Sequence, residues 1–143
     1  MDFDVHDQAL MLAGMASEVL LKALVVHCPQ MRTIVTTYRR RLDDAGKELH
    51  KVFYSHDLVR LASVARVALS DDQKDIADVL SEYISWRGRY VLPIEANLED
   101  LVPTPLHDGL VGMRHLSITI DASRVLLSRL IGEVKLRLYR DPT

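Results

Sequence analysis

The chain has 143 residues, of which 48% are hydrophobic and 27% are charged, and its formal net charge is −2. These values indicate one globular domain over residues 1–143, large enough to bury a core, and they exclude a global field that would attract nucleic acid or an anionic membrane. Cys28 is the only cysteine, which excludes an internal disulfide and a cysteine-based zinc site.

The first predicted helix covers residues 7–27, and Pro29 is expected to end it. Residues 9–26 are apolar almost all round and approach the length of a membrane span. Glu18 and Lys22 near the centre would cost several kcal/mol in a bilayer, so we expect a core helix. The acidic start of the chain, without an early Lys or Arg, is unlike a signal peptide, and we expect a cytoplasmic protein without a membrane anchor.

The next segment, residues 31–45, has apolar residues at helical spacing, and Gly46 is expected to stop the helix there. Residues 33–38 are rich in β-branched side chains and are also compatible with an extended strand; we favour a helix. Residues 47–54 are expected to form a loop.

Two helices with clear start signals follow. Ser55 is expected to cap the first, whose apolar stripe consists of Leu58, Leu61, Ala62, Ala65 and Leu69. Ser70 and Gln73 form a capping box for the second, which is expected to end near Gly88. The stripe of this second helix consists of Ile76, Leu80, Tyr83 and Ile84.

The last helix is expected to begin at Thr104 and Pro105, after a proline-bracketed strap over residues 93–105, and to reach Leu138. The sequence therefore predicts an all-α fold, an antiparallel up-and-down bundle of four to five helices with a long C-terminal helix. Six apolar residues of this helix are candidates for an interface: Leu126, Leu127, Leu130, Ile131, Val134 and Leu138.

Candidate ligand-binding residues lie at the ends of the middle helices. Arg87 continues the apolar stripe of its helix and can bind a phosphate, or it can neutralise the terminal carbonyl groups. Arg89 and Tyr90 follow it and leave the same two alternatives. His56, in the first helical turn before Arg60, can act as a general acid or base, or as a neutral structural residue.

Other polar residues leave a functional and a structural interpretation open. Glu18 and Lys22, four residues apart, either line a cleft or form a pair at the exposed edge of their helix. The basic run over residues 39–41 is expected to be solvated. His107, Arg114 and His115 share one face of the last helix, either as a catalytic group or as exposed residues. No two histidines stand three or four residues apart, and we expect neither a metal nor another cofactor.

Several of these segments resemble the HEPN superfamily of prokaryotic helical bundles. The run over residues 18–24 is similar to the family's first helix. The entry over residues 55–58 with Leu61, and the stretch from Tyr83 to Tyr90, are similar to its middle section. The resemblance implies a symmetric dimer. Many members are metal-independent ribonucleases of toxin–antitoxin or phage-defence systems, and others lack the active site and partner nucleotidyltransferases.

The nuclease members carry an Arg followed, after four to six residues, by a His, and none of the six histidines here has an Arg at that position. We therefore expect a non-catalytic, homodimerising interaction module with an antitoxin or a nucleotidyltransferase as partner. One alternative is a divergent ribonuclease that cleaves RNA with His107, Arg114 or His115 while Arg87 holds phosphate. Another is a bundle that binds a nucleotide or small anion at Arg87 and Arg89.

Overall fold

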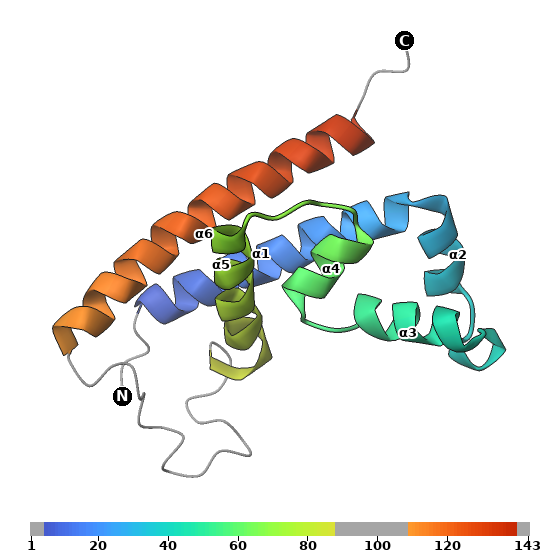
Figure 1. Ribbon diagram of the computed structural model, residues 1–143, viewed down its shortest axis with the longest axis horizontal. Helices are drawn as coiled ribbons and strands as arrows, with labels where there is room; N and C mark the ends of the chain where they lie inside the picture. The colour runs from blue at the N-terminus through green and yellow to red at the C-terminus, as the bar shows by residue number, and fades with distance from the viewer. Residues whose placement is uncertain (1–4, 88–108, 140–143) are drawn as a thin grey trace.

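The central helix of the fold is α1 (Val5–His27), which lies alongside α6 (Gly109–Leu138) and packs against it more extensively than against any other helix (Figure 1). The computed structural model describes the backbone of residues 5–87 and 109–139, and the side chains of residues 5, 7–85 and 120–139. The elements between α1 and α6 are α2 (Pro29–Thr36), the 3₁₀-helix η1 (Arg39–Arg41), α3 (Asp44–Phe53), α4 (Leu58–Val64), α5 (Asp71–Glu82) and the π-helix η2 (Tyr83–Arg87). The all-α class is confirmed for these residues, which contain no strand.

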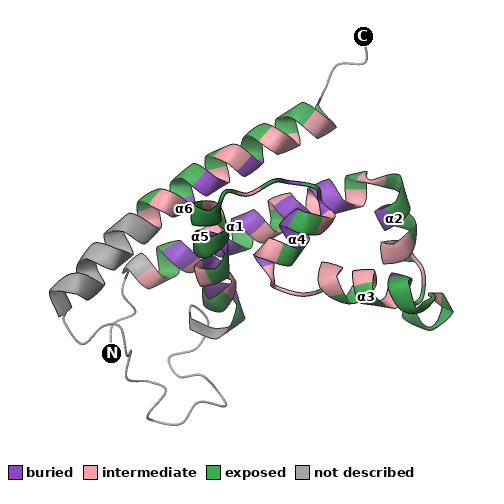
Figure 2. Cartoon of the chain, in the orientation of Figure 1, coloured by how far each residue is buried: buried purple, intermediate pink, exposed green. Residues whose placement is uncertain are grey.

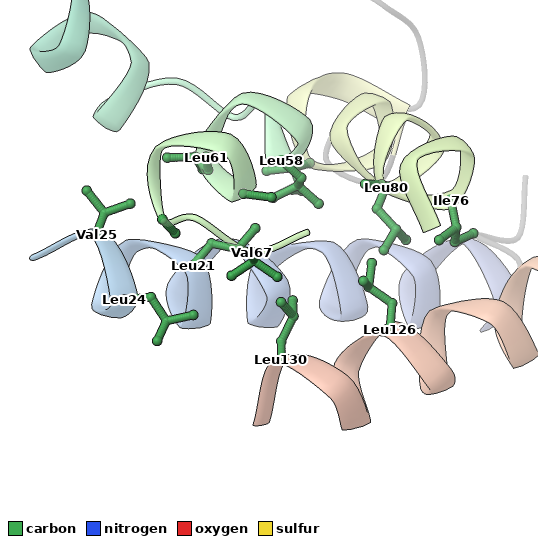
Figure 3. Close-up of a cluster of buried hydrophobic side chains, with 14 of the residues drawn as sticks. Leu21, Leu24, Val25, Leu58, Leu61, Val67, Ile76, Leu80, Leu126 and Leu130 are labelled. Atoms are coloured by element: carbon green, nitrogen blue, oxygen red, sulfur yellow. The ribbon is translucent and has the colours of Figure 1, made fainter. Parts of the chain in front are cut away.

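The core forms where α1 meets α4, α5 and α6. Its buried aliphatic side chains come from all four helices and from the segment after α4, and Figure 3 labels these members of the cluster: Leu21, Leu24, Val25, Leu58, Leu61, Val67, Ile76, Leu80, Leu126 and Leu130. Leu126 and Leu130 point from α6 into this cluster. Both had been expected to supply an interface, but they are 1% and 0% exposed, so they hold α6 on its own chain.

The antiparallel up-and-down arrangement is not confirmed. α1 and α6 begin at the same end of the molecule and run in the same direction (Figure 1). Parallel neighbours require the chain to return between them, and α2 to α5 provide that return. The C-terminal end of α6 at Leu138 agrees with the prediction, whereas the expected start at Thr104 and Pro105 lies outside the described residues.

The segment between α1 and α4 differs from the prediction. Pro29 does not only end α1 but also begins α2, where its missing N–H costs no hydrogen bond. Residues 47–54 are not a loop, because α3 spans most of them, and Gly46 lies in its first turn. The Asp43 side chain caps α3 by accepting a 2.7 Å hydrogen bond from the N–H of Gly46. Figure 2 shows α2 and α3 coloured mainly as intermediate and exposed, so they form the outer part of the fold.

Helix α4 is capped by Asp57, not by Ser55 as predicted. The Asp57 carboxylate accepts from the N–H of Arg60, whereas the Ser55 hydroxyl donates to the carbonyl of Val52. The Ser81 hydroxyl on α5 satisfies one more N–H of this helix end, that of Leu58, at 3.0 Å. This contact joins α4 to α5 at the point where α4 begins.

Helix α4 ends earlier than its apolar stripe predicted, in a Schellman motif. The N–H of Val67 donates to the carbonyl of Ala62 at 2.9 Å, and the N–H of Arg66 donates to that of Ser63 at 3.1 Å. Arg66 occupies the left-handed position, with φ at 58°. Leu69 therefore belongs to the connection after α4, from which it packs on the core.

The predicted capping box of α5 is confirmed, with Ser70 and Gln73 exchanging side-chain-to-backbone hydrogen bonds. The helix then continues as η2, and its end crosses α1 at Gly14. A Cβ atom at Gly14 would lie 2.7 Å from Cγ1 of Ile84 and 3.0 Å from the carbonyl oxygen of Leu80. The lack of a side chain at this position therefore sets how closely the two helices approach.

Candidate functional site

Glu18 on α1 and His56, just before α4, lie together. The Nδ1 atom of His56 is 2.9 Å from Oε2 of Glu18, while Nζ of Lys22 donates to Oε1 of the same carboxylate at 2.5 Å. Only 12% of the Glu18 side chain is exposed, so it does not lie at the exposed edge of its helix. Two residues considered separately in the sequence thus form one polar network.

The network lowers the pKa of its carboxyl group. Burial would raise the pKa of the Glu18 carboxyl, but hydrogen bonds from Lys22 and His56, together with their charges, outweigh it and lower that pKa. Glu18 is therefore ionised at neutral pH and can only accept hydrogen bonds. It follows that Nδ1 of His56 carries the hydrogen and donates it to Oε2 of Glu18.

His56 also lines an open groove of about 620 Å³ between the start of α4 and the end of α5. The groove is lined by Ser55, His56, Asp57, Asp78, Ser81, Glu82 and Ser85. Three of these seven residues are carboxylates, and the only basic side chain among them is the imidazole. This lining is mainly acidic, and the role of His56 in ligand binding stays a prediction.

The carboxylate–imidazole pair resembles the arrangement that orients a general base, but among the described residues no hydroxyl forms a hydrogen bond with His56. The three serines of the groove donate to backbone carbonyls: Ser55 to Val52 at 2.7 Å, Ser81 to Ala77 at 2.8 Å and Ser85 to Ser81 at 2.8 Å. Their hydroxyl hydrogens are thus used to hold local structure. The hydrogen bond between Glu18 and His56 therefore joins α1 to the start of α4 beside a polar groove.

The other predicted site residues have side chains outside the described part of the chain. Arg87 lies in η2, and Arg114 and His115 lie in α6, but their side chains are outside the described part of the chain. Arg89, Tyr90 and His107 lie outside the described residues altogether. Their proposed roles in RNA cleavage and anion binding therefore stay predictions. The basic run of η1 is exposed as expected, with the guanidinium groups of Arg40 and Arg41 each 5.8 Å from the ring of Tyr38.

Sequence reasoning missed the groove residues Asp78, Ser81 and Glu82. They follow the capping box at helical spacing, and no local pattern connects them with His56. Within the described residues, no group of three or more His, Cys, Asp or Glu side chains has the arrangement of a metal site.

Comparison with protein families, with curated proteins and with solved structures finds no match to this chain. The resemblance to the HEPN superfamily consequently stays a prediction, and the function has to be argued from the surface of the molecule itself.

Proposed function

We propose that this chain is a HEPN-like, non-catalytic interaction module that associates with a second copy of itself. The observation that carries the proposal is the side of α1 that faces away from the core. We call it the outer face of α1; it consists of the exposed residues Val5, Gln8, Ala9, Leu12, Met15, Ala16 and Val19.

The outer face of α1 is unusually apolar for an exposed surface. Leu12 is 60% exposed and Val19 is 68% exposed, and Gln8 is the only polar residue of the seven. A surface helix normally turns charged and polar residues away from the core. Contiguous exposed apolar surface on a soluble protein typically marks an interaction site, because association removes it from water.

A membrane is the other environment that would cover this face. By length and composition alone, α1 from Asp7 to His27 could cross a membrane, with a mean hydropathy of 1.9, and it is the one helix of this kind in the described part of the chain. Crossing a bilayer would separate Glu18 from His56 and strip the core of its central helix. We propose instead a cytoplasmic protein in which α1 stays packed on the other helices.

The association is tested by sedimentation velocity and light scattering at micromolar concentrations. We expect a dimer for the wild type and a monomer with unchanged helical circular dichroism for Leu12→Glu, because a charge at the centre of the outer face would be buried unpaired. Leu136→Glu, at an exposed position of α6, is the matched control and should remain a dimer. A wild-type monomer under these conditions would contradict the proposal.

An antitoxin or a nucleotidyltransferase, the partner kinds that the resemblance implies, would then bind a preformed dimer. Co-purification of the wild type with a partner protein tests this second step. Binding that survives Leu12→Glu would show that the partner does not depend on the dimer.

A further inference from the structure

We infer that the turn between α2 and α3 binds a short acidic segment of a partner protein. We call this surface the arginine turn; it consists of Tyr38, Arg39, Arg40 and Arg41, and all four residues are exposed. It lies at the edge of the molecule, where the chain passes from α2 to α3 (Figure 1). The inference rests on the proposed function, which supplies a protein partner, and it adds the place and the chemistry of the contact.

The backbone of the arginine turn is held in one conformation. The N–H of Arg41 donates to the carbonyl of Tyr38 at 2.9 Å, and the N–H of Leu42 donates to that of Arg39 at 3.2 Å. Leu42 then packs on the start of α3, where a Cβ atom at Gly46 would lie 3.2 Å from the Cβ atom of Leu42. The arginines therefore stand on an ordered support, which lowers the entropy that is lost when a ligand binds.

Tyr38 brings two of the guanidinium groups together. Consecutive residues of a 3₁₀-helix project about 120° apart. The guanidinium groups of Arg40 and Arg41 nevertheless both lie 5.8 Å from the centroid of the Tyr38 ring, which attracts cations. Tyr38 itself is 71% exposed, so a partner can reach the ring and the two cations at once. Tyr and Arg are also the residue types that often carry the binding energy of a protein interface.

No carboxylate of the described residues neutralises the arginine turn, because none of its arginines forms an ion pair there. Asp43, the nearest carboxylate along the chain, caps α3 by accepting a hydrogen bond from the N–H of Gly46 at 2.7 Å. Asp44 follows in the first turn of α3, where the helix dipole favours a negative charge. The guanidinium groups thus keep their paired N–H donors for the carboxylates of another molecule.

The distribution of charge along the chain favours a short anionic partner. Residues 29–53, which include α2, η1 and α3, contain six Lys or Arg against three Asp or Glu, whereas the rest of the chain contains twelve against seventeen. A long polyanion such as RNA would extend beyond the basic region and meet repulsion from the acidic remainder. A short acidic peptide segment would meet the arginine turn alone, and for this reason we assign the surface to a protein partner.

Fluorescence anisotropy with a labelled hexaglutamate peptide tests the inference. We expect the wild type to bind the peptide at low ionic strength and the affinity to fall as salt is added. The arginine variant carries three substitutions and should bind about tenfold more weakly: Arg39→Gln, Arg40→Gln and Arg41→Gln. The matched control loses the same charge at exposed positions elsewhere and should bind like the wild type: Lys74→Gln, Arg124→Gln and Lys135→Gln. Equal losses in both variants would show attraction by net charge alone and would overturn the inference.

Two substitutions of Tyr38 distinguish an arranged cluster from loose surface charge. Tyr38→Ala keeps every charge of the turn, yet it should weaken peptide binding several-fold, because Arg40 and Arg41 lose the ring that gathers them. Tyr38→Phe keeps the ring and should bind like the wild type. An unchanged affinity in Tyr38→Ala would contradict the inference, since the arginines would then act without an arrangement.

Each alternative occupant gives its own result. If an oligouridylate of the same net charge binds the arginine turn more tightly than the peptide, the surface serves a nucleic acid and the inference is wrong. If the arginine variant converts a wild-type dimer into a monomer in sedimentation velocity, the occupant is a second copy and the inference is wrong as well. A dimer that does not bind the peptide removes this inference and leaves the proposed association in place. A monomer that binds the peptide through the arginine turn removes the association and leaves this inference in place.

Discussion

The guanidinium group of Arg137 donates a hydrogen bond from Nη1 to the carbonyl oxygen of Ala65, at a distance of 2.5 Å. Its Nη2 atom donates to the next carbonyl, that of Arg66, at 2.9 Å. These carbonyl groups lie at the end of α4, where the helix leaves them without an intrahelical partner. The last turn of α6 thereby closes the end of α4, and Glu133 holds the guanidinium in place at 3.1 Å.

Replacing this arginine should destabilise the fold. For Arg137→Met we expect a loss of about 2–3 kcal/mol in the free energy of unfolding, because two hydrogen bonds from a charged donor are lost beside the buried Ala65. Urea unfolding followed by circular dichroism, at one fixed protein concentration, measures the loss. Lys135→Met, at an exposed position two residues away, is the control and should stay within about 0.5 kcal/mol of the wild type.

Arg66 adopts a backbone conformation that favours glycine. Its φ of 58° costs an L-residue roughly 1–2 kcal/mol in the folded state. Gly avoids this cost, but it also stabilises the unfolded chain through its greater conformational freedom, which offsets part of the gain. Arg66→Gly should therefore raise the free energy of unfolding by about 0.5–1 kcal/mol, measured by the same urea titration. Arg66→Ala removes the same side chain without relieving φ, so an equal gain in both variants would assign the effect to the side chain.

Two glycines in helices should respond to alanine with opposite signs. At Gly14 the added methyl group meets Ile84 and the backbone of α5, so Gly14→Ala should destabilise the fold by about 1–3 kcal/mol. At Gly132 nothing lies within 4 Å, so Gly132→Ala should stabilise α6 by up to about 1 kcal/mol through helix propensity. Thermal unfolding of both variants measures these changes in stability. If Gly14→Ala also stabilised the fold, the space at Gly14 would not restrict the approach of the two helices.

The Glu18 carboxyl should make stability depend on acid pH. Its pKa is lower in the folded state than in the unfolded chain, so its contribution is present in full above pH 4.5 and is lost as the pH falls through the folded value. Glu18→Gln should be less stable by about 1–3 kcal/mol at neutral pH. The difference from the wild type should shrink as the pH is lowered below 4.5.

Urea unfolding of both proteins at a series of pH values measures this difference. Glu48→Gln, at an exposed position of α3, is the control and should follow the wild type. A difference that stays constant with pH would mean that Glu18 acts through packing and not through its charge.

The parts of the fold that could be predicted depend on residues close together in the sequence. The capping box of α5 requires only Ser70 and Gln73, three residues apart, and it is confirmed. The end of α6 at Leu138 and the all-α class also follow from local apolar periodicity. The start of α4 was wrong because Ser55 and Asp57 can both cap a helix, and the choice between them involves Ser81, which is 23 residues from Leu58.

The other features that the sequence did not predict also depend on contacts between residues far apart in the chain. Helix α3 packs Leu49, Val52 and Phe53 on the core but buries only Gly46 completely, and this glycine near its start indicated a stop. The contact between Glu18 and His56 joins residues 38 positions apart, and no spacing rule connects them. The parallel course of α1 and α6 depends on the return path through α2 to α5, and the sequence did not predict the bounds of α2, α3 and α4 correctly.

The pairing of α1 with α6 delays folding during synthesis. Leu24 and Leu126, both in the core, are separated by about a hundred residues, which a ribosome adds in roughly 5–20 s. Throughout that time the inner side of α1 has no α6 to cover it, and its outer face is apolar as well. The nascent chain should therefore be a good client for a chaperone that shields apolar helices until α6 has emerged.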